Sequence, residues 1–317
     1  MNNLTAAVVG VGNMGRHHAR ILAGMSDVDL VAIVDPDAER ARPHAAVTGA
    51  SIVLSINELP PIDFAVIATP TDTHVSVASQ LMARGVHVLV EKPLAPSPPE
   101  AELLATSAKS NGVVLAVGHV ERFNAAVSLV AQLVTEPLLM SFERLSPYTP
   151  RIRDSVIFDL MVHDLDLACW IAGGYPTRVE AVGSKVLSDS ADVASAVLAF
   201  PNGAVATLTS SRVTQDKVRR ICVSETERFI VADSVRQDVS IKRETTMDYG
   251  EESGQMAYRQ ASVVEVPYLD RSGEPLAREL RDFIEAVRGE HAPRVDGDAG
   301  AAVVRLAYEV ERAASWS

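Results

Sequence analysis

The chain has 317 residues, of which 47% are hydrophobic and 22% are charged, an ordinary composition for a soluble globular protein. Because a domain holds roughly 150 residues, this length predicts two domains. The formal net charge of −12 argues against nucleic acid or an anionic membrane as a partner. No uninterrupted run of about 18 apolar residues occurs, so we expect no membrane span.

The start of the chain and its cysteines bear on where the protein works. Met1 is followed almost at once by an apolar segment, which predicts that no signal peptide is present. Cys169 and Cys222 stand in apolar contexts without the spacing of metal ligands, and we expect free thiols in a reducing compartment. These features predict a cytoplasmic protein without a bound metal.

The first third of the chain alternates apolar runs with segments of helical pattern. The runs are continuous, as is typical of a parallel sheet buried on both faces. Strand–helix–strand order with short turns predicts right-handed crossovers and a doubly wound α/β Rossmann domain over residues 1–120. The expected strands are 6–9, 30–34, 64–68, 86–90 and 113–117, and the expected helices are 17–25, 38–47, 75–84 and 99–111.

The pattern changes after residue 120. Apolar and polar residues alternate with a period of two between residues 178 and 267, which favours an antiparallel sheet with one covered face. Pro201-Asn202-Gly203 is typical of a hairpin turn. We expect an α+β domain over residues 121–317 that contains a large, mostly antiparallel open sheet. Its expected helices are 124–135, 156–172, 275–288 and 299–314, and its clearest strands are 179–182, 194–200 and 204–208.

A glycine motif follows the first expected strand and opens the first expected helix. Residues 10–15 fit the pattern G-x-G-x-x-G, in which the first glycine allows a tight turn and the second lets backbone approach a pyrophosphate. The third allows close helix–strand packing, and the helix N-terminus then faces the phosphates. A glycine turn in an unrelated αβ unit is the alternative. The residues predicted here to bind a dinucleotide are Gly10, Gly12, Asn13, Met14 and Gly15.

An acidic residue closes the second expected strand. Asp35 stands 20 residues after Gly15, where a carboxylate would bind the adenosine ribose hydroxyls. No Arg, Lys or Ser directly follows Asp35 to receive a 2′-phosphate, and we expect Arg40 and Arg42 to be solvated. The sequence therefore predicts NAD as the cofactor.

The expected strands 64–68 and 86–90 also end at the edge of the sheet where ligands bind. A lysine there projects into the ligand crevice of an open α/β sheet, although an ordinary loop lysine is the alternative for Lys92. A simple turn is likewise the alternative for residues 69–71. We expect His17 and His18, after the glycine motif, to be surface residues without a role. The residues predicted to line the cofactor are Thr69, Pro70, Thr71, Glu91, Lys92 and Pro93.

A second group of polar residues lies on the expected helix 156–172. Residues four apart share one face of a helix, so Asp159 and His163 are predicted neighbours, with Asp166 and Trp170 on the same stripe. Such a stripe suits chemistry, but a structural Asp–His pair is an alternative. A metal site is less favoured because a clear third ligand is missing.

These motifs together resemble the Gfo/Idh/MocA oxidoreductase family. The glycine motif, Glu91-Lys92-Pro93 and Asp159-x-x-x-His163 occur in that family's order and spacing, over essentially the whole chain. The resemblance implies that Lys92, Asp159 and His163 converge on the reacting carbon beside the nicotinamide. It leaves open whether Lys92 or His163 is the base, and it implies a homodimer or homotetramer. Residues 155–157 depart from the family, which often has glycines there.

A narrower resemblance concerns residues 118–124, 150–154 and 159–166. These segments are similar to the UDP-N-acetylglucosamine 3-dehydrogenase branch, which implies NAD-dependent oxidation of the sugar 3-hydroxyl to a ketone. It also implies that Arg122 and Asn124 contact the substrate. The rival hypotheses are another sugar or cyclitol dehydrogenase, a nucleotide-sugar ketoreductase, and a non-catalytic dinucleotide-binding sensor.

Three arginines precede the expected helix 156–172 in an otherwise acidic chain. Arg144, Arg151 and Arg153 offer guanidinium forks that suit the diphosphate of a nucleotide sugar. A solvated basic loop is the alternative. We predict that these arginines bind the substrate.

Overall fold

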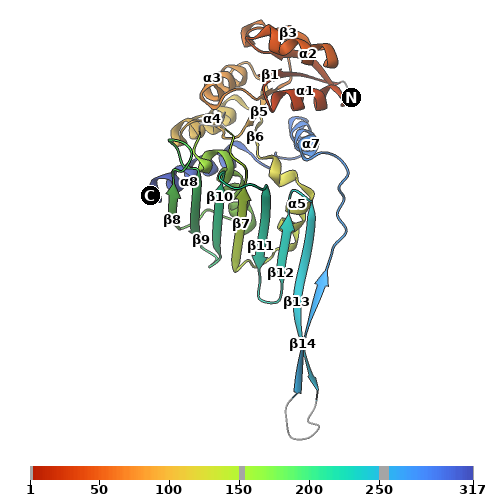
Figure 1. The fold of residues 1–317 in the computed structure, drawn as a ribbon. Helices are drawn as coiled ribbons and strands as arrows, with labels where there is room; N and C mark the ends of the chain where they lie inside the picture. The colour runs from red at the N-terminus through yellow and green to blue at the C-terminus, as the bar shows by residue number, and fades with distance from the viewer. Residues whose placement is uncertain (1–2, 150–153, 250–256, 317) are drawn as a thin grey trace. The chain divides into compact units, whose positions relative to one another are not determined.

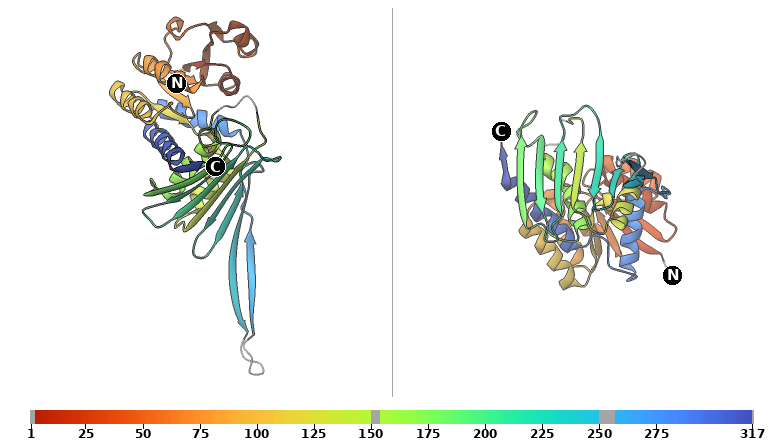
Figure 2. Two further views of the ribbon diagram at one scale, coloured as in Figure 1. Left: turned by 60° about the vertical axis from the view of Figure 1, so that its left-hand side comes forward. Right: turned by 90° about the horizontal axis from the view of Figure 1, so that it is seen from below.

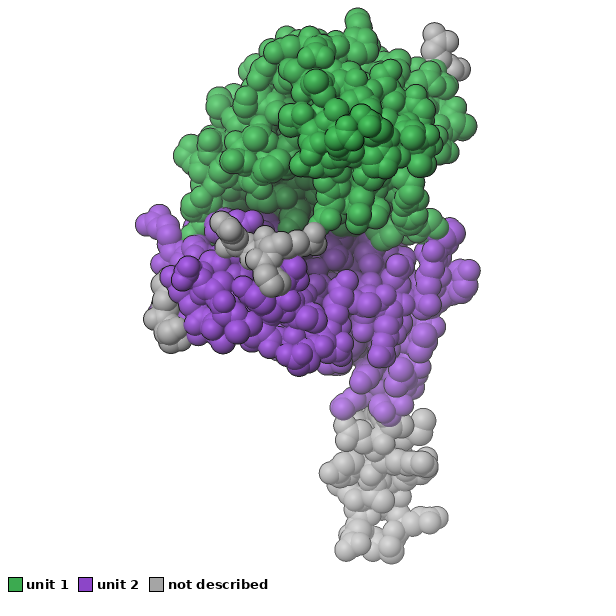
Figure 3. All heavy atoms as spheres, turned by 45° about the horizontal axis from the view of Figure 1, so that its top comes forward, with its two compact units in different colours: residues 1–120, 273–308 green, residues 121–272, 309–317 purple. Residues whose placement is uncertain are grey.

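A computed structural model describes residues 3–149, 154–249 and 257–316 of the chain. The chain divides into two units, which Figure 3 shows in different colours. Unit 1 comprises residues 1–120 and 273–308, and unit 2 comprises residues 121–272 and 309–317. In the described part of the chain, no helix is long and apolar enough to cross a membrane.

The sheet of unit 1 has six parallel strands in the order β3-β2-β1-β4-β5-β6 (Figure 1). Buried residues follow one another without alternation in β1 and β4, which confirms the predicted doubly wound sheet. The strand order reverses between β1 and β4, and such sheets bind ligands at this switch point. The strands are β1 (Leu4–Val9), β2 (Val28–Val34), β3 (Ser51–Val53), β4 (Phe64–Ile67), β5 (His87–Glu91) and β6 (Leu115–Gly118).

Helices connect the strands of unit 1. Asp37 caps α2 by accepting hydrogen bonds from the backbone N–H groups of Glu39 and Arg40, at 3.1 and 3.2 Å. Glycines in the left-handed conformation, Gly49 and Gly112, end α2 and α4. The helices are α1 (Gly15–Ala23), α2 (Ala38–Thr48), α3 (Thr71–Met82) and α4 (Pro98–Asn111), with the short 3₁₀ turn η1 (Ile56–Glu58). A second 3₁₀ turn, η2 (Val120–Phe123), begins at the last residue of the segment 1–120 and continues into unit 2.

The C-terminal helices correct the predicted domain boundary. Residues 273–308 were expected in the second domain, but they belong to unit 1. The rings of Phe283, on α7 (Pro275–Val287), and Phe64 meet edge to face at a centroid distance of 5.5 Å. A Cβ atom added at Gly300, on α8 (Gly297–Ala313), would lie 2.4 Å from a methyl group of Val117. Both helices therefore complete the hydrophobic core of unit 1.

Unit 2 contains a nine-stranded sheet in the order β14-β13-β12-β11-β7-β10-β9-β8-β15 (Figures 1 and 2). Two of the neighbouring pairs, β10–β7 and β15–β8, are parallel and the others are antiparallel, which confirms the expected, mostly antiparallel sheet. The strands are β7 (Leu139–Leu145), β8 (Arg178–Ser184), β9 (Val193–Ala199), β10 (Val205–Ser211), β11 (Val218–Ser224), β12 (Phe229–Asp233), β13 (Asp238–Tyr249), β14 (Ala257–Glu265) and β15 (Ala314–Trp316).

The sheet of unit 2 has one covered and one exposed face. Burial alternates along β7 and β9, as the period-two pattern predicts. The predicted hairpin joins β9 to β10, with Gly203 at a φ of 87°. The helical segments of this unit are α5 (Ala125–Leu133), the π-turn η3 (Ile157–Met161) and α6 (Val162–Ala172). The two cysteines are free.

Glu279 predicts a pH dependence of stability. This residue of α7 is 2% exposed, and neither carboxyl oxygen has a hydrogen-bond partner among the described residues. Burial, followed by the nearby Glu91 and Asp282, raises the pKa of Glu279 well above its usual range. The unfolded chain therefore loses this proton at lower pH than the native protein does, so native stability falls as pH rises from about 4.3 to the raised pKa.

Glu279→Gln should remove this loss, because glutamine has nearly the same shape and stays neutral. We expect the melting temperature of the variant to exceed that of the natural protein at pH 8, with a smaller difference at pH 5, as measured by circular dichroism. Glu290→Gln removes an exposed carboxylate from the same region and is the control. If the melting temperatures of the natural protein and of Glu279→Gln depend on pH in the same way, Glu279 is not a buried neutral carboxyl group.

Candidate active site

The glycine loop between β1 and α1 is closed by contacts that no larger residue permits. A Cβ atom at Gly15 would lie 1.8 Å from the carbonyl oxygen of Gly10, and Gly10 itself has a φ of +84°. Around Gly12 nothing lies within 4 Å of the position that a Cβ would take. The loop therefore packs tightly against α1 and leaves open space beside Gly12, where the motif predicts a pyrophosphate.

Asp35 holds the end of β2 to the glycine loop. Its Oδ2 accepts a hydrogen bond from the Val11 N–H at 3.1 Å, and its Oδ1 accepts one from the Asp37 N–H at 3.0 Å. A carboxylate offers about four acceptor sites, so the geometry leaves capacity for ribose hydroxyls. Arg40 differs from the expectation of a purely solvated side chain, because its Nη1 lies 3.6 Å from Oδ1 of Asp35.

A cavity of about 720 Å³ lies over the switch point of the sheet of unit 1. Its volume is within the range of small-molecule sites. Arg40 also lines it, whereas Gly15, Thr71 and Pro93 do not. The predicted cofactor residues that line the cavity are Gly10, Gly12, Asn13, Met14, Asp35, Thr69, Pro70, Glu91 and Lys92. The cavity suits a dinucleotide, because it has open space at the glycine loop and is lined by the carboxylate of Asp35 and by Lys92.

A buried contact between His18 and Glu91 supports the turn that carries Lys92. Nε2 of His18 lies 2.7 Å from Oε1 of Glu91, whose Oε2 accepts the Lys92 N–H at 3.3 Å. Burial by itself raises the pKa of Glu91, but the hydrogen bond from His18 and the charges of His18 and Lys92 outweigh it and lower the pKa. The expectation for His18 was wrong, since this side chain is fully buried.

His74 joins two strand-end turns. This buried residue of α3 was not predicted, although its position on the first turn of the helix was a signal. Nδ1 lies 3.0 Å from the Pro93 carbonyl oxygen and Nε2 lies 2.9 Å from that of Thr69. Burial lowers the pKa of His74, while the two carbonyl contacts oppose this. The Lys92–Pro93 peptide bond is cis.

In unit 2, Asp159 and His163 lie on consecutive helical segments. The expected single α-helix over 156–172 begins instead with the π-turn, which contains Asp159, and continues as α6, which contains His163. Both side chains are half-buried. A π-turn within a helix is rare and occurs frequently at functional sites. Among the residues that the structure describes, no three His, Cys, Asp or Glu side chains could hold a metal ion together.

The other half of the predicted stripe is a structural cluster. Arg122 bonds Asp166 through Nε at 2.8 Å and Nη2 at 2.6 Å, and its guanidinium lies 5.2 Å from the centre of the Trp170 ring. Asn124 caps α5 by accepting from the Ala126 N–H, and donates to the Ser234 carbonyl. Arg122 and Asn124 are thus buried parts of the scaffold, and their contact with the substrate stays a prediction.

Arg144 also has partners within the chain. Its Nη2 lies 2.7 Å from Asp164 and its Nη1 lies 2.9 Å from Glu121, while Nε bonds both oxygens of Asp164 at 3.0 Å. Burial lowers the pKa of Arg144, but these carboxylates outweigh it and raise the pKa. Arg144 therefore pairs with carboxylates of its own chain, and its contact with a substrate diphosphate stays a prediction. The predicted Arg151 and Arg153 lie outside the described residues.

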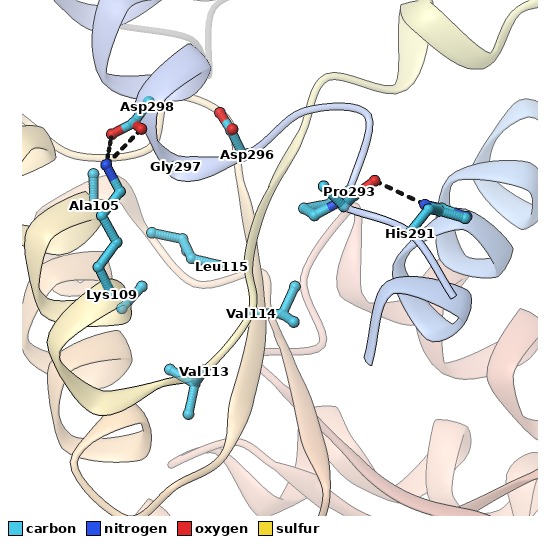
Figure 4. A pocket seen from close by; sticks show the side chains of 12 residues that line it. Ala105, Lys109, Val113, Val114, Leu115, His291, Pro293, Asp296, Gly297 and Asp298 are labelled. Atoms are coloured by element: carbon cyan, nitrogen blue, oxygen red, sulfur yellow. Dashed lines mark hydrogen bonds and ion pairs between the residues drawn. The ribbon is translucent and has the colours of Figure 1, made fainter. Parts of the chain in front are cut away.

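Unit 1 has a second hollow, of about 300 Å³, between α4, the start of β6 and residues 291–298 (Figure 4). Lys109 is its only fixed cation in the described lining, and Nζ already lies 2.6 and 2.8 Å from the two oxygens of Asp298. None of the predicted site residues lines this hollow. The larger cavity remains the candidate cofactor site.

Comparisons with known proteins agree with this geometry. The family described as "Oxidoreductase family, NAD-binding Rossmann fold" matches residues 4–119, and the GFO/IDH/MocA C-terminal domain matches residues 141–231. The chain is 35% identical over 313 residues to the UDP-N-acetylglucosamine 3-dehydrogenase of Acidithiobacillus ferrooxidans, covering 98% of this chain and 97% of that protein. A crystal structure of that enzyme superposes with a TM-score of 0.88 at 34% identity, over 99% of this chain and 98% of the other.

More distant relatives have other printed activities. The myo-inositol 2-dehydrogenase of Thermotoga maritima is 26% identical over 326 residues, which cover 96% of this chain and 94% of that protein. The structure of GenD2 from gentamicin A biosynthesis, in complex with NAD, has a TM-score of 0.81 at 25% identity, over 99% of this chain and 94% of the other. The chain belongs to the Gfo/Idh/MocA family and is an NAD-dependent oxidoreductase.

Proposed function

We propose that this enzyme oxidises the 3-hydroxyl of UDP-N-acetylglucosamine to the 3-keto nucleotide sugar, with NAD as the acceptor. The observation that carries the proposal is the similarity to UDP-N-acetylglucosamine 3-dehydrogenase over nearly the full length of both chains. The chain also has Lys92, Asp159 and His163, which a non-catalytic dinucleotide sensor would not need. A cyclitol dehydrogenase is the second candidate, because inositol dehydrogenases are among the relatives.

The substrate is tested by incubating the protein with NAD and UDP-N-acetylglucosamine and measuring reduced cofactor and product mass. Because alcohol oxidation by NAD can be uphill, a carbonyl reagent traps the ketone. We expect a product that has lost two hydrogen atoms before trapping. If myo-inositol is turned over and no trapped nucleotide sugar forms, the assignment of UDP-N-acetylglucosamine as substrate is wrong, and only the assignment to the family stands.

Oxidation of the sugar alcohol removes a hydride from the carbon and a proton from the hydroxyl group. NAD, if held in the cavity lined by Gly12, Asp35 and Lys92, would supply the acceptor for the hydride, and a base from the chain would remove the hydroxyl proton. We propose that neutral His163 is this base and that the Lys92 ammonium donates a hydrogen bond to the reacting oxygen, stabilising developing alkoxide charge. Asp159 orients the substrate or the imidazole. The alternative assigns the base to Lys92 and the hydrogen bond to His163.

Removal of either group should slow the chemical step. We expect Lys92→Met and His163→Ala each to lower kcat by roughly a hundredfold or more, the scale of general acid–base effects. Steady-state rates at saturating NAD and sugar measure this. Lys185→Met, at an exposed position, is the matched control for charge removal. A near-normal kcat in a folded Lys92 or His163 variant would remove that residue from the mechanism.

Asp35 should set the preference for NAD over NADP, because its carboxylate repels a 2′-phosphate. We expect the natural protein to show a higher kcat/KM with NAD, and Asp35→Ala to narrow the gap. Arg40 remains beside position 35 in that variant, and it can pair with the extra phosphate. Adding Arg40→Ala should therefore reverse part of the gain with NADP. Equal use of both cofactors by the natural protein would refute this role of Asp35.

We also propose that the protein forms a homodimer or homotetramer through the exposed face of the sheet of unit 2. Val182, Val197 and Leu139 lie on that face and are 57%, 44% and 46% exposed. Light scattering should give a multiple of the 33.9 kDa chain mass, and Val197→Lys should lower it. A monomer at micromolar concentration would contradict this.

A further inference from the structure

Unit 2 buries several arginines, and one of them differs from the rest. Arg219 is 8% exposed, and its hydrogen bonds go to neutral acceptors, the carbonyl oxygens of Leu145 and Val218 and the hydroxyl of Ser146. In the described part of unit 2, no carboxylate lies within ion-pair distance of it. The other buried arginines each have a carboxylate partner, namely Arg122 with Asp166, Arg144 with Asp164 and Glu121, and Arg212 with Asp192.

A buried charge without a partner costs free energy, so its presence needs an explanation. Burial and the neighbouring Arg144 lower the pKa of Arg219 to about 10, so the guanidinium still carries its charge at neutral pH. The charges of Asp164 and Glu121 also raise the pKa of Arg219, but both carboxylates bond directly to Arg144 and not to Arg219. Among the residues that the structure describes, Arg219 forms no ion pair of its own, which favours an anion from outside the chain as its partner.

The donors of Arg219 show how such an anion would be held. Its Nη1 donates to the two carbonyl oxygens and its Nη2 donates once, to Ser146. Arginine has five N–H donors, so the Nε–H and the second Nη2–H have no acceptor among the described residues. The Nε–H and an Nη2–H together form the side edge of a guanidinium, which binds phosphate or carboxylate in a bidentate manner.

The position of Arg219 suits a substrate group. It lies on β11 directly across from Arg144 on β7, and alternating burial puts both on the covered face of the sheet. Asp159, on the π-turn, is near enough for its charge to raise the pKa of Arg219 against the effect of burial. The open edge of the guanidinium is therefore in the neighbourhood of a proposed catalytic residue.

We propose that Arg219 binds the diphosphate of the nucleotide-sugar substrate through its Nε–H and Nη2–H. This rests on the proposed function, and it gives Arg219 the role that the sequence suggested for Arg144. The diphosphate is remote from the reacting carbon and has the same charge in the ground and transition states. Loss of Arg219 should therefore raise KM for the sugar nucleotide much more than it lowers kcat.

The test compares Arg219→Gln with Arg220→Gln. Arg220 is the next residue of β11, points to the other face and is half exposed, so its removal makes the same charge change. Calorimetric titration, with NAD present, measures binding of UDP and of uridine. We expect Arg219→Gln to weaken UDP binding by about tenfold or more, the usual scale for a charged hydrogen bond, without affecting uridine. Arg220→Gln should behave as the natural protein. An unchanged ratio of UDP to uridine affinity in Arg219→Gln would overturn the proposal.

Further arms separate this proposal from the substrate assignment. If the natural protein fails to oxidise UDP-N-acetylglucosamine but binds pyrophosphate in a manner that Arg219→Gln abolishes, the phosphate site stands and the substrate is wrong. If UDP-N-acetylglucosamine is oxidised and Arg219→Gln has the same KM for it as the natural protein, the substrate assignment stands and the proposed phosphate site at Arg219 is wrong. If Arg219→Gln weakens binding of glucuronate and leaves the affinity for UDP unchanged, Arg219 binds the carboxylate of a sugar acid. That result would overturn the proposal that Arg219 binds a diphosphate.

Arg219→Lys covers the case in which the glutamine variant does not fold. It keeps the positive charge but loses the two parallel donors, so we expect weaker UDP binding and an unchanged affinity for uridine. Melting temperature without ligand reports on folding. UDP binding by folded Arg219→Lys that equals that of the natural protein would exclude bidentate recognition.

Discussion

The cost of burying a charge shapes both units of this protein. In unit 1, Glu91 can stay ionised beneath the cofactor cavity because His18 reaches it from α1. In unit 2, Arg122 and Arg144 can lie under α6 because Asp166 and Asp164 face them from that helix. Each pair ties a strand end or a loop to a helix, so charge compensation also fixes where the strand-end turn of Lys92 and the segment carrying His163 lie within their own units.

Much of the fold was readable from the sequence because its signal is local. Continuous apolar runs identified β1, β2, β4, β5 and β6, and period-two alternation identified the sheet of unit 2. The short β3 was missed because only Val53 is buried. The place of α7 was missed because helical periodicity shows that a helix has an apolar face, not which sheet that face covers. The π-turn at 157–161 has no pattern that distinguishes it from an α-helix in this sequence.

The candidate site residues, like the elements of the fold, could be predicted where the sequence signal is local and not where it depends on distant partners. The glycine motif, Asp35 and Lys92 follow from their positions at strand ends, and most of the residues predicted there line one cavity. The internal carboxylate partners of Arg122 and Arg144 could not be predicted, because a guanidinium that binds a ligand and one that binds Asp164 look alike in a sequence. Their partners are 20 and 44 residues away along the chain. Even Arg219 and Arg220, adjacent in the chain, differ only in the face of β11 on which each lies.

The composition of unit 1 has a consequence for how the chain is made. Phe283, Leu280 and Ile284 pack in one core cluster with residues of β1 and β4, yet they are synthesised after all of residues 121–272. A ribosome that has released only the first 120 residues has released a sheet whose core lacks α7, with apolar surface open to water. The usual order, in which an N-terminal domain folds first during synthesis, is therefore not available to this nucleotide-binding unit. Its core closes only when nearly the whole polypeptide has emerged, and a truncated chain presents an incomplete Rossmann sheet rather than a smaller enzyme.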